Sequence, residues 1–553
     1  ALKARNKGER AGQGTLDLGG TSVADLVMPF AAAIAEIEHM PDTTVADIDA
    51  KRARLAKLRD SDAARRGRLA ADAWCAGIVA PKAKGEPPIT TATVRQAGDN
   101  PSRLDSDVLQ RIDELAVQYQ FLHLHLAFPD VFRVPEDGTV ATNQRTGWSG
   151  GFSCVLGNPP WERVKVLDRE WFATSSPEIA SAANASVRER LINDLVVSGD
   201  ATDEWMYRSY QRARRVGEAV VLFANASGRY PLMGTGDVDT YRLFAESAFH
   251  DCVGSSGYSG MVLPTGVVMD LPNKEFSRSL LDSFRLRVVL DFSNQAQIFK
   301  GIGGNKRFCL LVVGPTSSGN AIHGVSQVRR VAELRDSGRY FEVTASELLA
   351  INPLSASWIP FVDRRAAQVI SKIYQGGGGS LAPGREDDLF RPRTMHHMSG
   401  TSDRFHSEPG PGRVPLYEAK LFGMHNDRFA TFEGVPQSAR GGTKPKTLRL
   451  DDAALADPDH EMEPRYWLSA DDPDLRLDLP WLLVYRNTVS AVADARSMLA
   501  SLIPSFGLGH SATYVESLTG NADALKVLAA WLNSHMCDFV LRNKLAGSNV
   551  SQF

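Results

Sequence analysis

A short apolar run that ends in a rigid polar loop is the feature that most constrains the fold of this chain. Residues 152–156 (FSCVL) are followed by Gly157 and then by Asn158-Pro159-Pro160-Trp161. An apolar run closed by glycine predicts a buried strand that ends in a tight turn. In an open α/β sheet, ligands bind at the carboxyl ends of the strands. The sequence therefore predicts a binding loop at residues 158–161.

The residue types of this loop suggest what it binds. An Asn amide oxygen can accept a hydrogen bond from an amino group. Proline keeps its carbonyl and fixes φ, so Pro159-Pro160 is a rigid pair of acceptors, and Trp161 offers a flat apolar face for stacking. Together they suit an exocyclic amine on a planar ring. Asn-Pro and Pro-Pro are also common turn dipeptides, but the preceding strand and the following aromatic residue favour a site.

The segment Gly157 to Trp161 resembles motif IV of the amino-methyltransferases that use S-adenosylmethionine. It is most similar to adenine-specific (N6) DNA methyltransferases of the restriction–modification type, especially the type IIG-like ones. Other segments resemble parts of the same family in the same order: residues 125–132 (HLAFPDVF), 239–246 (DTYRLFAE), 260–266 (GMVLPTG), Phe299 with 307–313 (RFCLLVV), 415–420 (PLYEAK), 532–534 (LNS) and 547–549 (GSN).

The resemblance implies an α/β fold: a partial S-adenosylmethionine-dependent methyltransferase (Rossmann-like) sheet with helical insertions, followed by a mixed α+β target-recognition domain. The family's glycine-rich cofactor turn after the first strand is not found. Residues 15–20 (TLDLGG) imitate it, but they follow a charged polar stretch, which favours a loop. Because the chain also begins at Ala1 without a methionine, we expect a fragment of a longer protein whose upstream part carries the cofactor loop.

The resemblance also implies roles for individual residues. Asn158 and the Pro159 carbonyl would accept the two N–H groups of an adenine amine, while Trp161 and Phe299 would lie against opposite faces of the flipped base. Pro160 and Phe244 match positions that line the adenine of S-adenosylmethionine. Two of these residues have ordinary alternatives, because Phe299 could be a core aromatic near a loop and Phe244 could belong to the buried face of its helix.

Composition narrows the class of protein. The 553 residues carry a formal net charge of −3, which neither requires nor excludes a nucleic-acid partner. Five cysteines are widely scattered, without metal-ligand spacing, and Cys154 and Cys309 lie in apolar runs as expected of core residues. No apolar stretch approaches the ~20 residues of a membrane span, and no signal peptide is visible. We expect a cytoplasmic protein with no bound metal and no membrane partner.

Periodicity and linker signals divide the chain into four regions. We expect a helical insertion and linker region at 1–100, the C-terminal half of the catalytic domain at 101–330, a linker region at 331–389 that includes Gly376-Gly377-Gly378-Gly379-Ser380, and a recognition domain at 390–553. Within the catalytic part, strands are expected at 152–156, 259–263, 286–291 and 307–313, the last two as an antiparallel hairpin, with a helical insertion at 168–230. A single helix is expected over 523–545.

The recognition domain would contact double-stranded DNA. Basic candidates for phosphate or base contacts are Arg440, Lys444, Lys446, Arg449 and Arg486, and residues 438–449 form the strongest patch because they are basic and free of acid. Each of these residues is individually more often an ordinary surface charge. Subunits of a restriction or defence system are further expected partners, and the sequence carries no signal for an oligomeric state.

The favoured function is site-specific methyl transfer to the N6 amine of a flipped adenine, within a restriction–modification or phage-defence system. Methylation of RNA or of a protein glutamine stays open, because these reactions also use Asn-Pro-Pro-aromatic pockets. A further alternative is a DNA-recognition fragment without activity, which the missing cofactor loop suggests.

Overall fold

The computed structural model divides into two compact units. The first comprises residues 1–268 and 275–320, and the second comprises residues 269–274 and 321–553. The residues that the structure describes are 6–7, 23–135, 139–182, 184–304, 306–316, 321–375, 389–398, 400–440, 445–476, 479–489, 495–545 and 550. The stretch at 15–20, Gly376 to Ser380 and Lys444 lie outside them.

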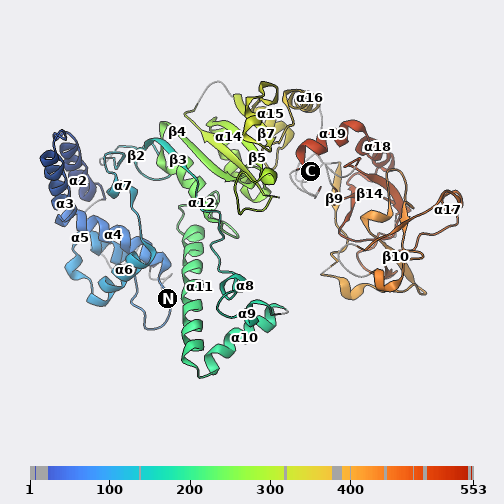
Figure 1. Ribbon diagram of the computed structural model, residues 1–553, viewed down its shortest axis with the longest axis horizontal. Helices are drawn as coiled ribbons and strands as arrows, with labels where there is room; N and C mark the ends of the chain where they lie inside the picture. The colour runs from blue at the N-terminus through green and yellow to red at the C-terminus, as the bar shows by residue number, and fades with distance from the viewer. Residues whose placement is uncertain are drawn as a thin grey trace. The chain divides into compact units, whose positions relative to one another are not determined.

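The first unit begins with helices, in agreement with the helical region expected within residues 1–100. They are α2 (Val23–Glu38), α3 (Val45–Arg59), α4 (Asp62–Val79), α5 (Thr91–Asp99) and α6 (Ser106–Tyr119), followed by the short α7 (Leu124–Ala127) (Figure 1). Thr44 caps α3 with a reciprocal bond to Asp47, and Ser61 caps α4. Ile112 and Leu115 of α6 pack with Ala73, Ala76 and Val79 of α4 in a core that excludes water.

Four strands of this unit lie side by side in the order β3-β4-β6-β5 within one sheet. Their bounds are Phe152–Gly157 (β3), Val253–Pro264 (β4), Leu286–Ser293 (β5) and Arg307–Val313 (β6). β3 runs parallel to β4, while β6 lies between β4 and β5 and is antiparallel to both. The predicted hairpin of β5 and β6 is therefore confirmed, and the apolar sequence of β6 follows from its central position in the sheet.

The expectation of a buried first strand is wrong. Leu156 is 79% exposed, and Ser153 and Cys154 are also exposed. Among the described residues, β4 is the one strand that pairs with β3, so β3 is an edge strand. The two strands come very close at their start. A Cβ on Gly151 (φ +134°) or on Gly257 would lie 2.5 Å from a backbone atom of the opposite strand.

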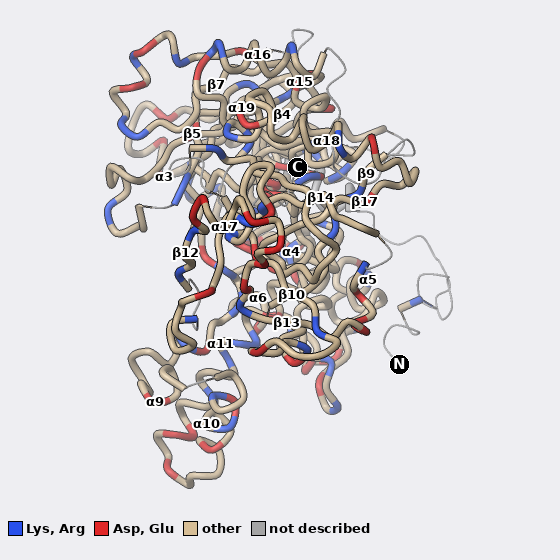
Figure 2. Tube along the Cα trace, turned by 90° about the vertical axis from the view of Figure 1, so that its right-hand side faces the viewer, with Lys and Arg blue, Asp and Glu red and all other residues tan. Residues whose placement is uncertain are grey.

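A helical arm follows the binding loop, as predicted for residues 168–230. It consists of α8 (Asp168–Trp171), α9 (Pro177–Ala180), α10 (Ala185–Val197) and the long α11 (Ala201–Ala226). Its own core contains Phe172, Ile179, Ile192, Leu195 and Tyr210. Figure 1 shows α11 extending away from the sheet with α8 to α10 beside it, and Figure 2 shows acidic and basic residues interspersed along α9 and α10.

The remaining elements lie before, between and after the strands of the sheet. They are β1 (Phe132–Arg133) and β2 (Ser149–Gly150) before β3, α12 (Thr240–Glu246) with a π-helical turn at 247–252 before β4, and α13 (Gly266–Met269) and α14 (Lys274–Asp282) between β4 and β5.

The second unit begins before the expected boundary. Residues 331–375 are folded rather than a linker: they include β8 (Phe341–Thr344), paired with β7 (Ala321–Val328), and helices α15 (Ala345–Ile351) and α16 (Arg364–Gln375). Trp358 and Phe361 are buried against Phe341, at ring-centroid distances of 5.6 and 5.1 Å. The apolar residues of this stretch therefore form a core.

The rest of the second unit is a mixed α+β fold, in agreement with prediction. A four-stranded sheet has the order β15-β14-β17-β9 and a three-stranded sheet the order β13-β10-β16. Their bounds, with those of the shorter elements, are β9 (Phe390–Arg393), β10 (Arg413–Tyr417), β11 (Ala430–Thr431), β12 (Leu448–Arg449), α17 (Asp452–Ala456), β13 (Tyr466–Ser469), β14 (Trp481–Arg486), β15 (Ala500–Pro504), β16 (Gly507–Leu508) and β17 (Ala512–Ser517).

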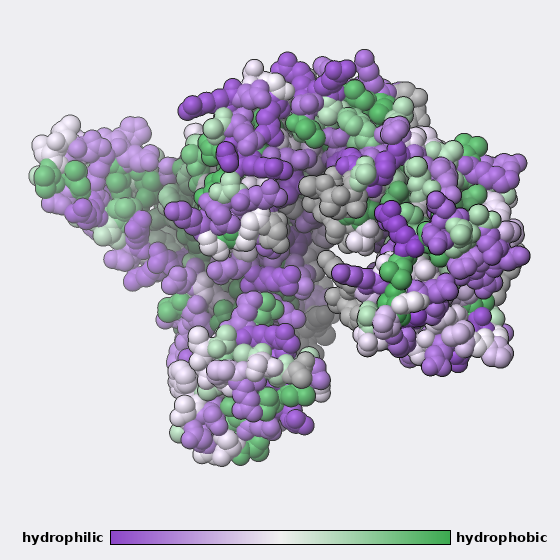
Figure 3. All heavy atoms as spheres, turned by 45° about the vertical axis from the view of Figure 1, so that its right-hand side comes forward, coloured by the Kyte–Doolittle hydropathy of each residue, from purple (hydrophilic) through white to green (hydrophobic). Residues whose placement is uncertain are grey.

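The expected single helix at 523–545 is two helices, α18 (Ala522–Leu532) and α19 (His535–Lys544). The break occurs because Asn533 bonds both the N–H and the carbonyl of Ala500 through its side chain, and Ser534 caps α19 by accepting from the Cys537 N–H. Among the described helices, none is long and apolar enough to cross a membrane. In the view of Figure 3, hydrophobic residues lie in small groups among hydrophilic ones.

Candidate functional site

The carboxyl ends of three strands and the start of a fourth meet at one end of the first unit's sheet. β3 ends at Gly157, which pairs with Met261 of β4, and β4 ends at Pro264, which pairs with Phe308 of β6. β5 ends at Ser293, opposite the first residue of the antiparallel β6. The carboxyl ends of β3, β4 and β5 therefore lie together, which is where ligands bind in open α/β sheets.

The loop after β3 presents its polar groups to the outside. Asn158 and Pro160 are exposed, whereas Pro159 is buried and Trp161 is half-buried. Within the described part of the chain, neither the Asn158 amide nor the Pro159 carbonyl has a hydrogen-bond partner, and the buried indole N–H of Trp161 has none either. Proline fixes the backbone on both sides of the bend. The loop thus holds two acceptors that the protein does not use internally.

Helix α12 is hydrogen-bonded to this loop through its first residue, Thr240. The Thr240 hydroxyl donates to the Pro160 carbonyl at 2.6 Å and approaches the Glu162 carbonyl at 3.1 Å, and the Thr240 N–H donates to the same Glu162 oxygen at 2.9 Å. Phe244 lies one helical turn from Thr240, hence on the same side of α12. Its side chain is 51% exposed, so it does not belong to the buried face of the helix.

Phe299 lies beside the loop although 138 positions separate it from Trp161 in the numbering. The two rings meet edge to face, with centroids 6.1 Å apart and planes at 74°. Phe299 also meets Phe308 at 4.8 Å, and Phe308 stacks on Phe292 at 5.0 Å. The aromatic residues continue from the sheet interior to the loop, so Phe299 is anchored on one side and faces Trp161 on the other.

A buried asparagine that the sequence analysis did not single out shapes the Phe299 segment. Asn294 is fully buried. Its Nδ2 donates to the carbonyls of Phe299 and Ile302 at 3.0 and 2.9 Å, and its Oδ1 accepts from the Phe299 N–H at 2.9 Å. The chain turns through Gln297 in the left-handed region (φ 54°). The only signal in sequence is an Asn directly after a strand, which is too common to be diagnostic.

A second buried polar group lies at the ends of β4 and β5. Asp291 is fully buried, accepts from the Thr265 hydroxyl at 2.9 Å and is paired with Arg307. A buried carboxylate is stable only when it is paired and hydrogen-bonded. These contacts join three strand ends directly beneath the aromatic residues of the site.

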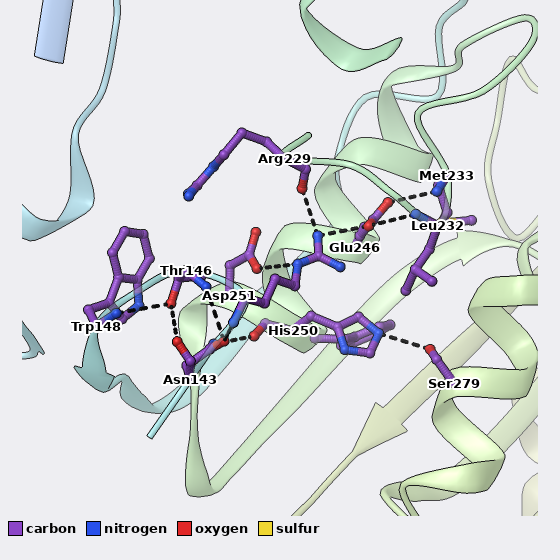
Figure 4. Close-up of polar contacts among 12 residues, drawn as sticks. Asn143, Thr146, Trp148, Arg229, Leu232, Met233, Glu246, His250, Asp251 and Ser279 are labelled. Atoms are coloured by element: carbon purple, nitrogen blue, oxygen red, sulfur yellow. Dashed lines mark hydrogen bonds and ion pairs between the residues drawn. The ribbon is translucent and has the colours of Figure 1, made fainter. Parts of the chain in front are cut away.

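An ion-pair network holds the end of α12 and the π-helical turn that follows it (Figure 4). Arg145 contacts Glu246 at 2.7 Å and Asp251 at 2.9 Å, and Glu246 accepts from the backbone N–H groups of Leu232 and Met233. Burial raises the pKa of Asp251, which Arg145 opposes. Burial also lowers the pKa of His250 to about 3, so its imidazole is neutral at neutral pH, with Nε2 3.1 Å from the Ser279 hydroxyl.

The helical arm also contacts the segment that follows the loop. Val164 donates its N–H to the carbonyl of Val238, and a Cβ at Gly217 of α11 would lie 2.6 Å from the Val164 carbonyl oxygen. A glycine in the middle of a long helix costs about 1 kcal/mol relative to alanine. Here it is required by the close approach, and the sequence pattern of the helix alone does not reveal it.

The basic candidates in the second unit are not equivalent. Lys446 and Arg449 are exposed, and the Arg449 guanidinium lies 4.8 Å above the Phe429 ring. Two predicted contacts need correction. Arg440 is 11% exposed and bonds Glu463 at 2.6 Å and the carbonyls of Val435 and Phe432, and Arg486 donates to the Phe422 carbonyl. Their guanidinium groups are bonded to acceptors of their own unit, which favours a structural role for both residues.

Comparisons with known proteins identify neighbours at the level of structure. No protein-family model and no curated relative matches the chain. The type IIG restriction endonuclease BpuSI is 12% identical, with coverage of 92% of this chain and 74% of that chain and a TM-score of 0.25. The methyltransferase subunit of a type I restriction-modification system from Streptococcus thermophilus is 11% identical (64% and 78% coverage, TM-score 0.22). The type IIL restriction-modification enzyme MmeI in complex with DNA is 13% identical (72% and 44%, TM-score 0.32).

These structural neighbours are restriction-modification enzymes. TM-scores of this size leave the function to be argued from the residues themselves.

Proposed function

We propose that this chain forms the base-binding half of an adenine-specific (N6) DNA methyltransferase of the restriction–modification type. One observation carries the proposal. At the carboxyl end of the sheet, the unused acceptors of Asn158 and Pro159 lie in a rigid loop beside Trp161, whose ring meets that of Phe299 edge to face at 6.1 Å. A primary amine on a planar aromatic base offers two N–H donors to these acceptors and a flat face to Trp161, and a base that stacks on both rings requires the two rings to separate as it enters.

The proposed reaction follows from these positions. A base inside a duplex is extruded before it is modified, at a cost of a few kcal/mol that stacking and hydrogen bonds offset. Asn158 and the Pro159 carbonyl accept the two amine N–H groups, which draws the nitrogen lone pair out of conjugation with the ring. S-adenosylmethionine supplies an electrophilic methyl group when bound. The nitrogen loses its proton after the new bond has formed, so positioned acceptors suffice and no strong general base is required.

Part of a cofactor site is consistent with the residues present. The Pro160 carbonyl accepts the hydrogen bond of Thr240, and Phe244, one helical turn further along α12, is exposed and offers an apolar face to an adenine ring. The donor's remaining contacts would come from a glycine-rich turn, which we place on a strand that pairs with the free edge of β3. The edge of β3 that is unpaired within the described part of the chain offers its backbone N–H and carbonyl groups to such a strand.

The DNA duplex would be held by the second unit. Lys446 and Arg449 are exposed on a short segment at β12, and Lys444 completes the basic patch in sequence. Lys and Arg side chains contact phosphates and fix the register of the protein on the duplex. Double-stranded DNA is the proposed substrate, and subunits of the same restriction or defence system are proposed partners.

The test is methyl transfer from labelled S-adenosylmethionine by the full-length protein to DNA, RNA and protein offered together. We expect label in DNA, at the N6 position of adenine, and its loss by at least 100-fold in Asn158→Ala without a change in DNA affinity. Exposed Asn225→Ala on α11 is the matched control. Label in RNA or in a protein glutamine, or full activity in Asn158→Ala, would contradict the proposal.

A second candidate has its own observation in favour of it. Among the described residues, no strand with a glycine-rich turn pairs with β3, so these 553 residues alone could act in recognition without catalysis. Calorimetry of this chain with S-adenosylmethionine separates the two candidates. Absence of saturable binding supports a recognition fragment, whereas saturable binding that Phe244→Ala weakens supports a donor site within the chain.

A further inference from the structure

A buried histidine in the second unit faces two carboxylates that come from a different part of the chain. His396 follows β9 and is fully buried, and neither of its ring nitrogens has a hydrogen-bond partner among the residues that the structure describes. Its Nε2 lies 3.8 Å from Oδ1 of Asp472, a residue in the connection after β13. Together with Asp474, these residues bring one nitrogen and two carboxylate groups within 4.8 Å of one another.

An imidazole in this position needs an explanation. Leaving a buried polar group without a partner costs about 1–3 kcal/mol, so native proteins rarely retain one without a function. A hydrogen bond to Asp472 would require a distance of about 2.7–3.2 Å. The observed 3.8 Å is too long for a direct bond, whereas an intervening metal ion bonded to both atoms would keep them roughly 3–3.5 Å apart.

Arg404 neutralises part of the charge of the two carboxylates from the side of their Oδ2 atoms. Arg404 approaches Oδ2 of both, at 3.5 Å for Asp472 and 2.8 Å for Asp474. Oδ1 of Asp472 accepts the Asp474 N–H at 3.0 Å and points toward His396. One arginine against two carboxylates leaves a net charge of −1 beside a neutral imidazole. Arg404 then orients the carboxylates from behind, as outer groups do in metal sites.

We propose that His396, Asp472 and Asp474 bind one divalent transition-metal ion of the Zn²⁺ type. The donor set decides the class of ion, because imidazole nitrogen suits Zn²⁺ whereas Mg²⁺ and Ca²⁺ take oxygen ligands. Asp472 is 4% exposed and anchored, while Asp474 is 49% exposed and can rotate inward to close the site. Its open side admits water as a further ligand. The ion joins the segment after β9 to the β13–β14 connection and so stiffens the recognition half.

This site has no signature in the sequence. His396 lies far from Asp472 and Asp474 along the chain, so spacing rules predict no bound metal, and only the fold brings the three residues together. The inference stands independently of the methyltransferase proposal, because it rests on the second unit alone.

The experiment uses the full chain, stripped with a chelator and dialysed, in competition with a chromophoric Zn²⁺ indicator. We expect one equivalent of Zn²⁺ to bind and to raise Tm, while Mg²⁺ at the same concentration does neither. Asp474→Asn should lower the Zn²⁺ affinity at least tenfold and abolish the Tm shift. Asp471→Asn, which removes the same charge from an exposed neighbour in the same connection, should leave both unchanged.

His396→Gln provides a second test, with circular dichroism to verify its fold. If it folds, it should lose Zn²⁺ binding as Asp474→Asn does. The proposal is overturned if the stripped protein binds no equivalent of Zn²⁺, if Asp474→Asn and Asp471→Asn bind it equally, or if Mg²⁺ reproduces the Tm shift.

Discussion

Asn158 and Arg440 were both predicted to contact a ligand, and the structure places their side chains differently. Asn158 is exposed on a loop that Thr240 holds through the Pro160 carbonyl. Arg440 is turned inward and bonds three acceptors of its own unit, whereas Lys446 and Arg449 of the same basic segment are exposed. The loop motif therefore identified an exposed side chain, whereas a basic residue type alone did not separate Arg440 from its exposed neighbours.

The largest expected effect tests the scaffold behind the loop. Arg145→Met leaves the buried carboxylates of Glu246 and Asp251 without their cation, which should lower the free energy of unfolding by about 3–5 kcal/mol. Arg214→Met is the control, because its ion pair with Glu218 is half exposed and should contribute less than about 0.5 kcal/mol. Urea denaturation measures both variants. Equal stability of the two would show that α12 does not depend on this network.

Arg440 and Arg449 test the contrast within the basic segment. Arg440→Met should lower the free energy of unfolding by about 2–3 kcal/mol, because it removes hydrogen bonds from Glu463 and two carbonyls. Arg449→Met should leave stability nearly unchanged but weaken DNA binding, with the slope of log K against log salt reduced by about 1. Salt-dependent fluorescence anisotropy measures the latter. If Arg440→Met changed the salt slope and Arg449→Met did not, the DNA contact would belong to Arg440 rather than to Arg449.

The buried histidines of the first unit predict a pH dependence. Burial lowers the pKa of His250 to about 3 and that of His125 to about 4, from 6.5. As pH falls, the unfolded chain therefore binds a proton at each histidine before the folded chain does. The stability that the neutral histidines contribute is fully present above about pH 6.5 and is lost as pH falls toward 4. Each histidine contributes up to about 1.4 kcal/mol per pH unit in that window.

The measurement is the urea midpoint at about pH 7 and about pH 5. His250→Gln should flatten the dependence, whereas exposed His39→Gln should not. An unchanged slope in His250→Gln would mean that His250 titrates normally in the folded protein.

Phe244 should show the smallest effect on stability. Its side chain is 51% exposed, so Phe244→Ala should change the free energy of unfolding by less than about 1 kcal/mol, against about 3–5 kcal/mol for a core phenylalanine such as Phe276. If it lines the donor site, the variant should raise KM for S-adenosylmethionine in the full-length protein with little effect on Tm. A large decrease in Tm would show that Phe244 contributes to the hydrophobic core.

Local sequence signals predicted much of the fold of the first unit. Apolar runs located β3 to β6, because a strand is determined by a pattern within a few residues, and the helical region near the start of the chain and the helical arm were also expected. The exposure of β3 was missed, since an edge strand and a central strand can have the same apolar run. The folded stretch at 331–375 was missed because Trp358 and Phe361 lack regular spacing.

The candidate site was predictable where it lies in one loop and unpredictable where it depends on distant contacts. Asn158 to Trp161 could be identified from adjacent residues, and Phe299 from the order of segments. The Asn294 contacts to the Phe299 loop, the close approach at Gly217 and the meeting of His396 with Asp472 depend on tertiary structure. No short-range pattern records them.

The central claim is that Trp161 and Phe299 act on the same flipped base. It is tested most directly by a double-mutant cycle of Trp161→Ala and Phe299→Ala in single-turnover methyl transfer by the full-length protein. Stacking on a base is worth about 1–3 kcal/mol, so each variant should lower the rate, and the two effects should be coupled by about 1 kcal/mol or more. If the free-energy effects of the two substitutions instead add to within about 0.3–0.5 kcal/mol, as expected of independent sites, the result would contradict a base shared by the two rings.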